Sequence, residues 1–120
     1  MTQEEIIEGN KLIAEFMGLH FHKIGWVDKY HIDGNYECER LDYYGSWDWL
    51  MPVVEKIEID CTCDVHIYGH YNWKESNRCS ILDWKDNEIV SKSNDSKSQC
   101  VFDAVIEFIK WYNETQNGKN

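Results

Sequence analysis

The chain of 120 residues is long enough for one domain with a substantial core and too short for two. Its 42% hydrophobic and 28% charged residues are typical of a folded globular protein and argue against a disordered chain. Twelve Lys and Arg against 22 Asp and Glu leave a net charge of −10, which argues against direct binding to a nucleic-acid backbone. No apolar run is long enough to span a bilayer, and the first residues lack the pattern of a secretion signal. We therefore expect a cytoplasmic protein without membrane contact.

The first predicted element is a helix over residues 3–17. Thr2 followed by Glu5 has the spacing of a capping box. Apolar side chains then recur at helical spacing, and Gly18 can end the helix because glycine adopts the left-handed conformation without steric cost. Gly9 costs about 1 kcal/mol relative to alanine inside a helix. We expect it to be tolerated because another element packs closely there.

The stretch between the first and second helices is harder to assign. Apolar residues alternate with His20 and His22, as they would on the two faces of a strand. Turns are expected at Gly25 and at Asp33 with the glycine that follows it. Residues 33–44 are predicted to form a loop or an edge strand.

A second helix is predicted over residues 47–58. Ser46 can cap it, and Pro52 lies deep enough in the pattern to kink the helix or to break one of its hydrogen bonds. Residues 61–74 and 78–85 then predict a β-hairpin, which the NEIVSK segment extends with a third strand.

The last predicted helix, over residues 98–114, has the clearest pattern. Ser96 or Ser98 can cap it. Its apolar arc is wide enough for a central helix that packs against a sheet on one side and against helices on the other. Residues 1–120 are therefore expected to form a single α+β domain, with an antiparallel sheet of three or more strands, about three helices and a disordered C-terminal end.

The five cysteines indicate reduced thiols, because their number is odd and no secretion signal precedes them. Cys61 and Cys63 share one face of the predicted strand with apolar residues, and we expect both to point inward. The cysteines and five histidines supply enough zinc ligands in number, but their spacing does not give the two close pairs of a structural zinc site. We therefore expect no disulfide, no metal site and no cofactor, although a zinc-binding protein remains an alternative.

A second alternative is a small metal-dependent, nuclease-like enzyme. Asp83 and Lys85 have the acid-x-lysine form on a predicted strand, and Asp64 lies upstream on the partner strand. Two carboxylates could hold magnesium while the lysine orients the attacking water. The missing basic surface and the short length of the motif weigh against this alternative, and we do not expect an enzyme.

The most informative feature is a stretch of carboxylates mixed with aromatic rings. Residues 1–60 carry 13 acidic and five basic side chains, whereas residues 61–120 carry nine and seven. Aromatic rings supply contact area in protein interfaces, and carboxylates attract a basic partner. The alternative is an acidic face that only keeps the protein soluble. The predicted partner-binding residues are Asp33, Tyr36, Glu37, Glu39, Asp42, Tyr43, Tyr44, Trp47 and Asp48.

Three segments also resemble a group of short hypothetical proteins from bacteriophages and Bacteroidetes-type bacteria. They are NKLIAEFMG at 10–18, SWDWLMPVVEKIE at 46–58 and AVIEFIKWYNE at 104–114. The resemblance implies a phage or mobile-element origin and a location in the cytoplasm of a bacterial host, and it implies no activity. Together with the charge, it predicts a non-enzymatic protein binder, such as an anti-defence inhibitor that blocks a basic, nucleic-acid-handling host protein.

Overall fold

The computed structural model describes residues 2–24, 27–32, 36–38, 41–69 and 77–117. For the described residues between 20 and 38 it gives the course of the backbone alone. Helices and antiparallel strands form a single α+β domain, as the sequence predicts. In chain order the elements are α1 (Gln3–Phe16), β1 (Leu19–Ile24), β2 (Val27–Ile32), β3 (Tyr36–Cys38), α2 (Trp47–Asp60), β4 (Asp64–Tyr68), β5 (Asn77–Leu82), β6 (Glu88–Asn94) and α3 (Lys97–Asn117).

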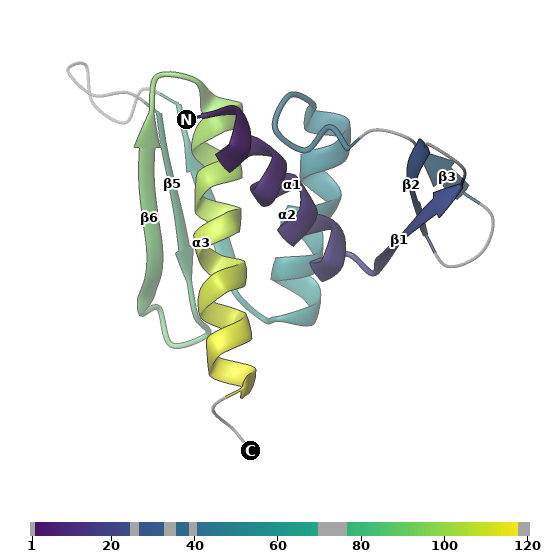
Figure 1. The fold of residues 1–120 in the computed structure, drawn as a ribbon. Coiled ribbons are helices and arrows are strands. Elements are labelled where there is room, and N and C mark those ends of the chain that lie inside the picture. The colour runs from purple at the N-terminus through teal and green to yellow at the C-terminus, as the bar shows by residue number, and fades with distance from the viewer. Residues whose placement is uncertain (1, 25–26, 33–35, 39–40, 70–76, 118–120) are drawn as a thin grey trace.

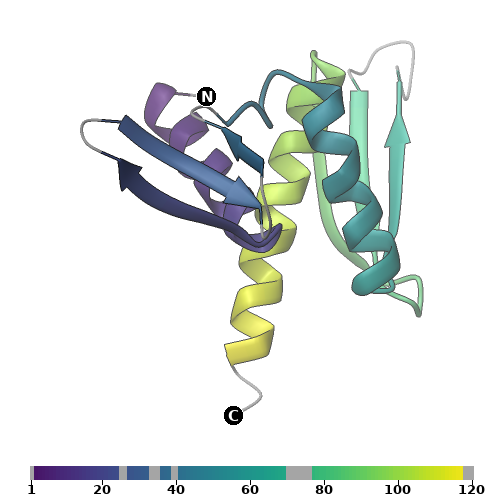
Figure 2. The ribbon, with the colours of Figure 1, turned by 90° about the vertical axis from the view of Figure 1, so that its right-hand side faces the viewer.

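The helix α3 lies at the centre, with the β4–β5–β6 sheet on one side and α1 and α2 on the other (Figures 1 and 2). Val101, Phe102, Val105 and Phe108 are completely buried, so the predicted central helix is confirmed. Its first turn is capped by Ser96, one of the two predicted serines, whose Oγ accepts a hydrogen bond from a backbone amide of that turn at 3.4 Å. An apolar arc this wide requires cover on more than one side, and the layered arrangement provides it.

The helix α1 begins and ends as its sequence predicts. The Thr2 hydroxyl accepts a hydrogen bond from the Glu5 amide at 3.1 Å and lies within 3.1 Å of the Glu5 carboxylate. The chain leaves the helix at Gly18, whose φ of 79° is the left-handed conformation that glycine favours. The expectation about Gly9 is also confirmed, because Phe102 and Ile106 of α3 occupy the space in front of its Cα.

The helix α2 continues through Pro52, although proline cannot donate the hydrogen bond of an ordinary helical residue. Ser46 is at the N-cap position with an extended backbone, but its side chain makes no capping hydrogen bond, so the expected cap is not formed. The backbone carbonyl of Ser46 instead accepts the amide of Leu50 at 3.0 Å. Lys56 connects α2 to α1, since its Nζ donates to the Phe16 carbonyl at 2.5 Å.

The β4–β5–β6 sheet is antiparallel throughout and contains the predicted hairpin and the third strand. The hairpin differs from the prediction at its start, because β4 begins only at Asp64. Cys61 caps the C-terminus of α2, and Thr62, with a φ of 52°, turns the chain toward the strand. The residues between the two predicted hairpin strands, 75–77, fall largely outside the described residues, which resume at Asn77 in β5.

A second three-stranded sheet, which the sequence indicated only as alternating stretches, is formed by β1, β2 and β3. The strand β3 pairs with β2 alone, so of the two possibilities for this segment the edge strand is correct for Tyr36–Cys38. The expected turns at Gly25 and Asp33 lie outside the described residues. In Figure 1 this sheet stands beside the helices, away from the β4–β5–β6 sheet.

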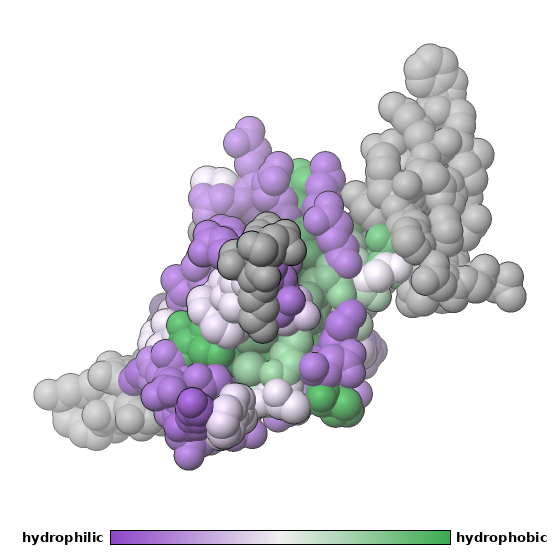
Figure 3. Space-filling model, turned by 90° about the horizontal axis from the view of Figure 1, so that it is seen from below, coloured by the Kyte–Doolittle hydropathy of each residue, from purple (hydrophilic) through white to green (hydrophobic). Residues whose placement is uncertain are grey.

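Viewed from below, the coloured part of the surface is largely hydrophilic, with smaller hydrophobic areas between the hydrophilic residues (Figure 3). The two most exposed large apolar side chains described are Ile59, near the end of α2, and Trp84, in the β5–β6 turn. Single exposed apolar residues of this kind are ordinary on protein surfaces.

Candidate functional site

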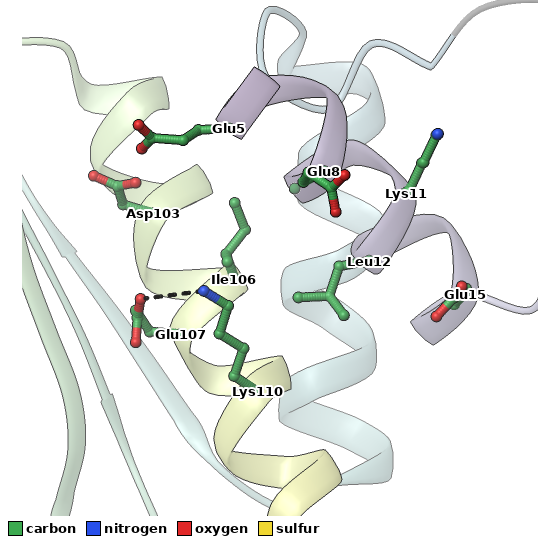
Figure 4. Close-up of a pocket in the computed structure, with 10 residues that line it drawn as sticks. Glu5, Glu8, Lys11, Leu12, Glu15, Asp103, Ile106, Glu107 and Lys110 are labelled. Carbon is green, nitrogen blue, oxygen red and sulfur yellow. Dashed lines mark ion pairs between the residues drawn. The ribbon is translucent and has the colours of Figure 1, made fainter. Parts of the chain in front are cut away.

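A groove of about 440 Å³ lies between α1 and α3 (Figure 4). Its apolar floor consists of Gly9, Leu12 and Ile106, and the side chains of Leu12 and Ile106 both extend into the space between the helices. The rim is formed by charged residues from both helices, namely Glu5, Glu8, Lys11, Glu15, Asp103, Glu107 and Lys110.

The groove is closed at its base because the two helices approach closely at Gly9. A Cβ at this position would lie 2.7 Å from Cζ of Phe102, a distance that real Cβ contacts essentially never show. Glycine thus brings the α1 backbone against the buried ring of α3. The spacing of the helices, and with it the width of the groove, depends on this contact.

The electrostatic character of the rim is negative, with five carboxylates against two ammonium groups. One of the ammonium groups, on Lys110, lies 3.9 Å from the Glu107 carboxylate of its own helix. Burial raises the pKa of Asp103, and the neighbouring carboxylates of Glu107 and Glu5 raise it further, although Lys92 opposes the shift. Burial is the largest cause of this raised pKa, and the carboxylates beside Asp103 add negative charge that would stabilise an incoming cation.

A second hollow of about 390 Å³ lies between β6 and α3 on the other side of the same helix turns. It shares Glu107 and Lys110 with the first groove, and its lining includes Trp111, whose side chain is 40% exposed. The Glu107–Lys110 pair therefore forms a ridge between two depressions.

The structure separates the predicted partner-binding residues into three groups. Asp33 and Glu39 lie outside the described residues. Tyr36 and Glu37 belong to β3, where their backbones pair with β2. The other five are described with their side chains, and among them Asp42, Trp47 and Asp48 are exposed.

The two remaining tyrosines belong mainly to the core. Tyr43 is 4% exposed and packs edge-on against Trp49, with ring centroids 5.1 Å apart. Tyr44 packs edge-on against Phe102, also at 5.1 Å. The expectation that Tyr43 serves as a surface anchor is therefore wrong: its ring packs inside the domain, where a ring buries the most apolar area. Tyr44, which is half-buried, retains only part of its ring for outside contacts.

The nuclease-like residues are arranged differently from the prediction. Asp83 follows the end of β5 and lies in the turn to β6, so the acid-x-lysine motif is not on a strand. Its carboxylate accepts the backbone amides of Lys85 and Asn87, each at 2.9 Å. These hydrogen bonds lower the pKa of Asp83 and hold the turn in shape. Lys85 lies over the ring of Trp84, with its Nζ 4.9 Å from the centroid.

Four cysteines are described with their side chains, and all four are free thiols. Cys63 is buried as predicted, whereas Cys61 is only half-buried because it ends a helix and does not belong to the strand. Burial raises the pKa of both, which is the behaviour of structural rather than reactive cysteines. Among the residues whose side chains are described, no group of three or more His, Cys, Asp and Glu could hold a metal ion.

The groove could not be predicted from a run of acidic residues because its carboxylates are not close in sequence. The carboxylates of the groove come from two helices at opposite ends of the chain. Each half was visible as a polar helix edge, Glu8 and Glu15 on the first helix and Asp103 and Glu107 on the last. Their proximity follows only from the packing of α1 on α3.

The helices of the described part of the chain include none whose length and apolar character would allow it to cross a membrane. Comparisons with models of known families, with curated proteins and with solved structures find no match to this chain.

Proposed function

We propose that this protein is a small, acidic, non-enzymatic binding module whose α1–α3 groove receives a basic, amphipathic segment of a partner protein. The observation that carries this proposal is the combination of an apolar floor with a rim of five carboxylates in one groove. An apolar floor alone would suit many ligands, and an acidic surface alone would only improve solubility. Together they favour a segment with apolar side chains on one face and Lys or Arg beside them.

The geometry suggests how such a segment would be recognised. Its apolar side chains would cover Leu12 and Ile106, and its cations would lie between Glu5 and Asp103 at one end and near Glu15 at the other. The floor would supply most of the affinity, because removing apolar area from water is favourable. The carboxylates would accelerate association and select against acidic partners.

A basic protein that handles nucleic acid is the partner class that this chemistry suits best. Such a protein presents clustered Lys and Arg, and the carboxylates of the groove would compete for the cations that otherwise hold phosphates. The resemblance to phage proteins supports the further proposal that this competition occurs in a bacterial host, where the chain would act as an anti-defence inhibitor. Trp47 and Asp48 are exposed at the start of α2 and are available for contact with a partner.

The first experiment uses a defined probe. A fluorescent helical peptide of Lys and Leu, amphipathic in one version and scrambled in the other, is titrated into the full chain at several salt concentrations. We expect the amphipathic peptide to bind more tightly, and its affinity to fall as salt rises, because the Debye length shortens from about 10 Å at 0.1 M to about 3 Å at 1 M.

A matched pair of variants tests the position of the site. Glu8→Lys with Glu15→Lys reverses two exposed charges at the groove, whereas Glu55→Lys with Glu58→Lys makes the same change in charge on exposed positions of α2. The groove pair should lose at least about tenfold in affinity, and the α2 pair should lose much less. Equal losses in the two pairs, or binding that does not depend on salt, would overturn the proposal.

The natural partner is then sought by capture from a bacterial lysate with the same two variants. A protein counts as the partner only if wild type and the α2 pair retain it, the groove pair loses it, and wild type displaces nucleic acid from it. If captured proteins show no such dependence on the groove, the inhibitor hypothesis is wrong even where the peptide binds.

A further inference from the structure

The strand β6 forms an edge of the β4–β5–β6 sheet. Among the described residues it pairs with β5 alone, and Figure 1 shows it as the outermost strand of this sheet. In an edge strand of an antiparallel sheet, every second residue directs its N–H and C=O groups away from the sheet. The outer side of β6 therefore presents a row of backbone donors and acceptors to which no other described strand pairs.

The hollow between β6 and α3 lies along this edge. Its strand side consists of the consecutive residues 89–92. Neighbouring strand residues point to opposite faces, so a hollow over one face would be lined by every second residue only. Its helix side consists of Glu107, Lys110, Trp111 and Glu114, whose spacing of three or four residues forms one stripe of α3. The hollow is thus a groove between a strand edge and a helix stripe, and we call it the edge groove.

One irregularity interrupts the pairing of β6, and it lies near the start of the strand. From Asn94 back to Val90 each residue has a partner in β5, and Ile89 then forms a bulge before the last pair. Bulges at sheet edges can protect an edge from further pairing. Here the regular part from Val90 to Asn94 is about 17 Å long at about 3.4 Å per residue, so an added strand has room to pair beyond the bulge.

The two lysines of the edge groove lie beside carboxylates of the same protein. The Nζ of Lys110 is 3.9 Å from the Glu107 carboxylate (Figure 4). Lys92 is close enough to Asp103 that its charge opposes the rise in the pKa of that carboxyl. At this end of the groove the positive charges are therefore offset within the fold.

The other end of the edge groove combines an exposed ring with a carboxylate. Trp111 is 40% exposed, and its ring packs against Phe108 with centroids 5.7 Å apart, which holds it in place from the core side. Glu114, one turn further along α3, forms no ion pair with a described Lys or Arg. A guanidinium group suits this pair, because it stacks on the face of an indole and donates two N–H groups to a carboxylate.

We propose that the edge groove binds an extended, arginine-containing segment of a partner protein, which adds a strand to the sheet at β6. Backbone hydrogen bonds to β6 hold the segment, as in other cases of strand addition. Its arginine lies over Trp111 with the guanidinium group at Glu114. Lys92 and Lys110 disfavour a second cation at the other end, so the charge pattern selects a segment with a single arginine anchor.

The net charge of the chain favours this occupant over a second copy of the protein. Edge strands of identical chains can pair with each other. A net charge of −10 makes two copies repel each other, whereas it attracts a basic segment. The proposal does not rest on the helix-binding function of the α1–α3 groove, because the edge groove recognises an extended backbone and shares only Glu107 and Lys110 with it.

The test uses a short fluorescent peptide of alternating Thr and Val with one central Arg, titrated into the full chain. Two further versions carry N-methyl groups on alternate amides, one version for each edge of the extended peptide. We expect binding of one peptide per chain, lost when one edge is methylated and kept when the other is, because a strand pairs through one edge only. A version with Glu in place of Arg should bind at least about tenfold more weakly. Hydrogen exchange should show that outward-pointing amides of β6 gain protection on binding.

Variants of the protein locate the anchor. Trp111→Ala should weaken binding at least about tenfold, as expected for an aromatic anchor, and Glu114→Gln should weaken it by a smaller factor. Glu114 is exposed, so Glu114→Gln tests the site even if Trp111→Ala loosens the packing on Phe108. The matched controls lie on α2: Trp47→Ala removes a ring that is 38% exposed, and Glu55→Gln neutralises an exposed carboxylate. Both controls should bind the peptide like wild type.

Three results would overturn the proposal. Equal binding of all the N-methylated versions, or no gain of protection in β6, would show that no strand is added. Binding lost with Glu8→Lys and Glu15→Lys but kept in Trp111→Ala would assign the peptide to the α1–α3 groove. A dimer of the free chain whose β6 amides are already protected would assign the edge to a second copy. Loss of the helical peptide alone, with the strand peptide still bound, would contradict the function proposed for the α1–α3 groove and support an independent edge groove.

Discussion

Replacing Gly9 with alanine tests whether the contact between α1 and α3 determines the stability of the helical core. Alanine is the better helix former by about 0.8–1.0 kcal/mol, so the substitution would stabilise an isolated helix. In this fold the added Cβ would meet Ile106 and would lie 2.7 Å from Cζ of Phe102. The two neighbours differ in their freedom to move.

Ile106 reaches the contact with its terminal methyl group and lines the groove, so it can change its rotamer toward open space. Phe102 is completely buried, and its ring is held edge-on by Tyr44 at 5.1 Å between centroids. The ring cannot move without shifting its neighbours. Inserting a methyl group into such a site typically costs about 1–3 kcal/mol. After subtracting the gain in helix propensity, we expect Gly9→Ala to destabilise the protein by about 0.5–2 kcal/mol.

Urea denaturation followed by circular dichroism measures this difference, with Glu8→Ala as a control at the neighbouring exposed position of α1. The cost should shrink in a Phe102→Leu background, where the end of the ring is absent, so a double-mutant cycle isolates the contact. If Gly9→Ala instead raises stability by the full gain in propensity, the helices are not in close contact at this point and the shape of the groove is wrong.

Three further predictions concern the core, the groove and the thiols. Val105→Asp should destabilise by about 3–5 kcal/mol, because it buries an unpaired charge at a completely buried position; a variant that melts like wild type would contradict the central position of α3. Burial raises the folded-state pKa of Asp103, so stability present at low pH is lost as pH rises through that pKa. Asp103→Asn should therefore be more stable than wild type at pH 7, by a margin that shrinks as pH falls toward 4 and that a pH series of urea titrations measures; a margin independent of pH would contradict this. Cys79, whose pKa burial raises to about 12, should react slowly with a thiol reagent in the folded protein, as should the buried Cys63. The half-buried Cys61 should react sooner, and equal fast labelling of all three would show that the protein opens at these positions.

The helices could be predicted because their signals are local. The capping residues of α1, the stop at Gly18 and the wide apolar arc of α3 each depend on residues within a few positions of one another. The β4–β5 hairpin was recognised for the same reason. Its start was misplaced because Cys61 and Cys63 continue the alternation of the strand, whereas the backbone between them is turning.

The β1–β2–β3 sheet could not be predicted to the same degree because strand pairing is not local. Alternation around His20 and His22 indicates a strand but not its partner, and a shift of one residue in register would place His31 and Glu37 on the other face. The register is therefore information that the structure adds to the sequence.

The exposure of aromatic rings was equally out of reach. Tyr43 and Tyr44 lie among acidic residues in the sequence, which is compatible with a surface patch and also with rings that pack beneath a charged face. In the structure Tyr43 packs against Trp49 and Tyr44 packs against Phe102, so the rings lie beneath the charged face. Composition reports that a segment is acidic and aromatic, but burial depends on which side of the chain faces α3.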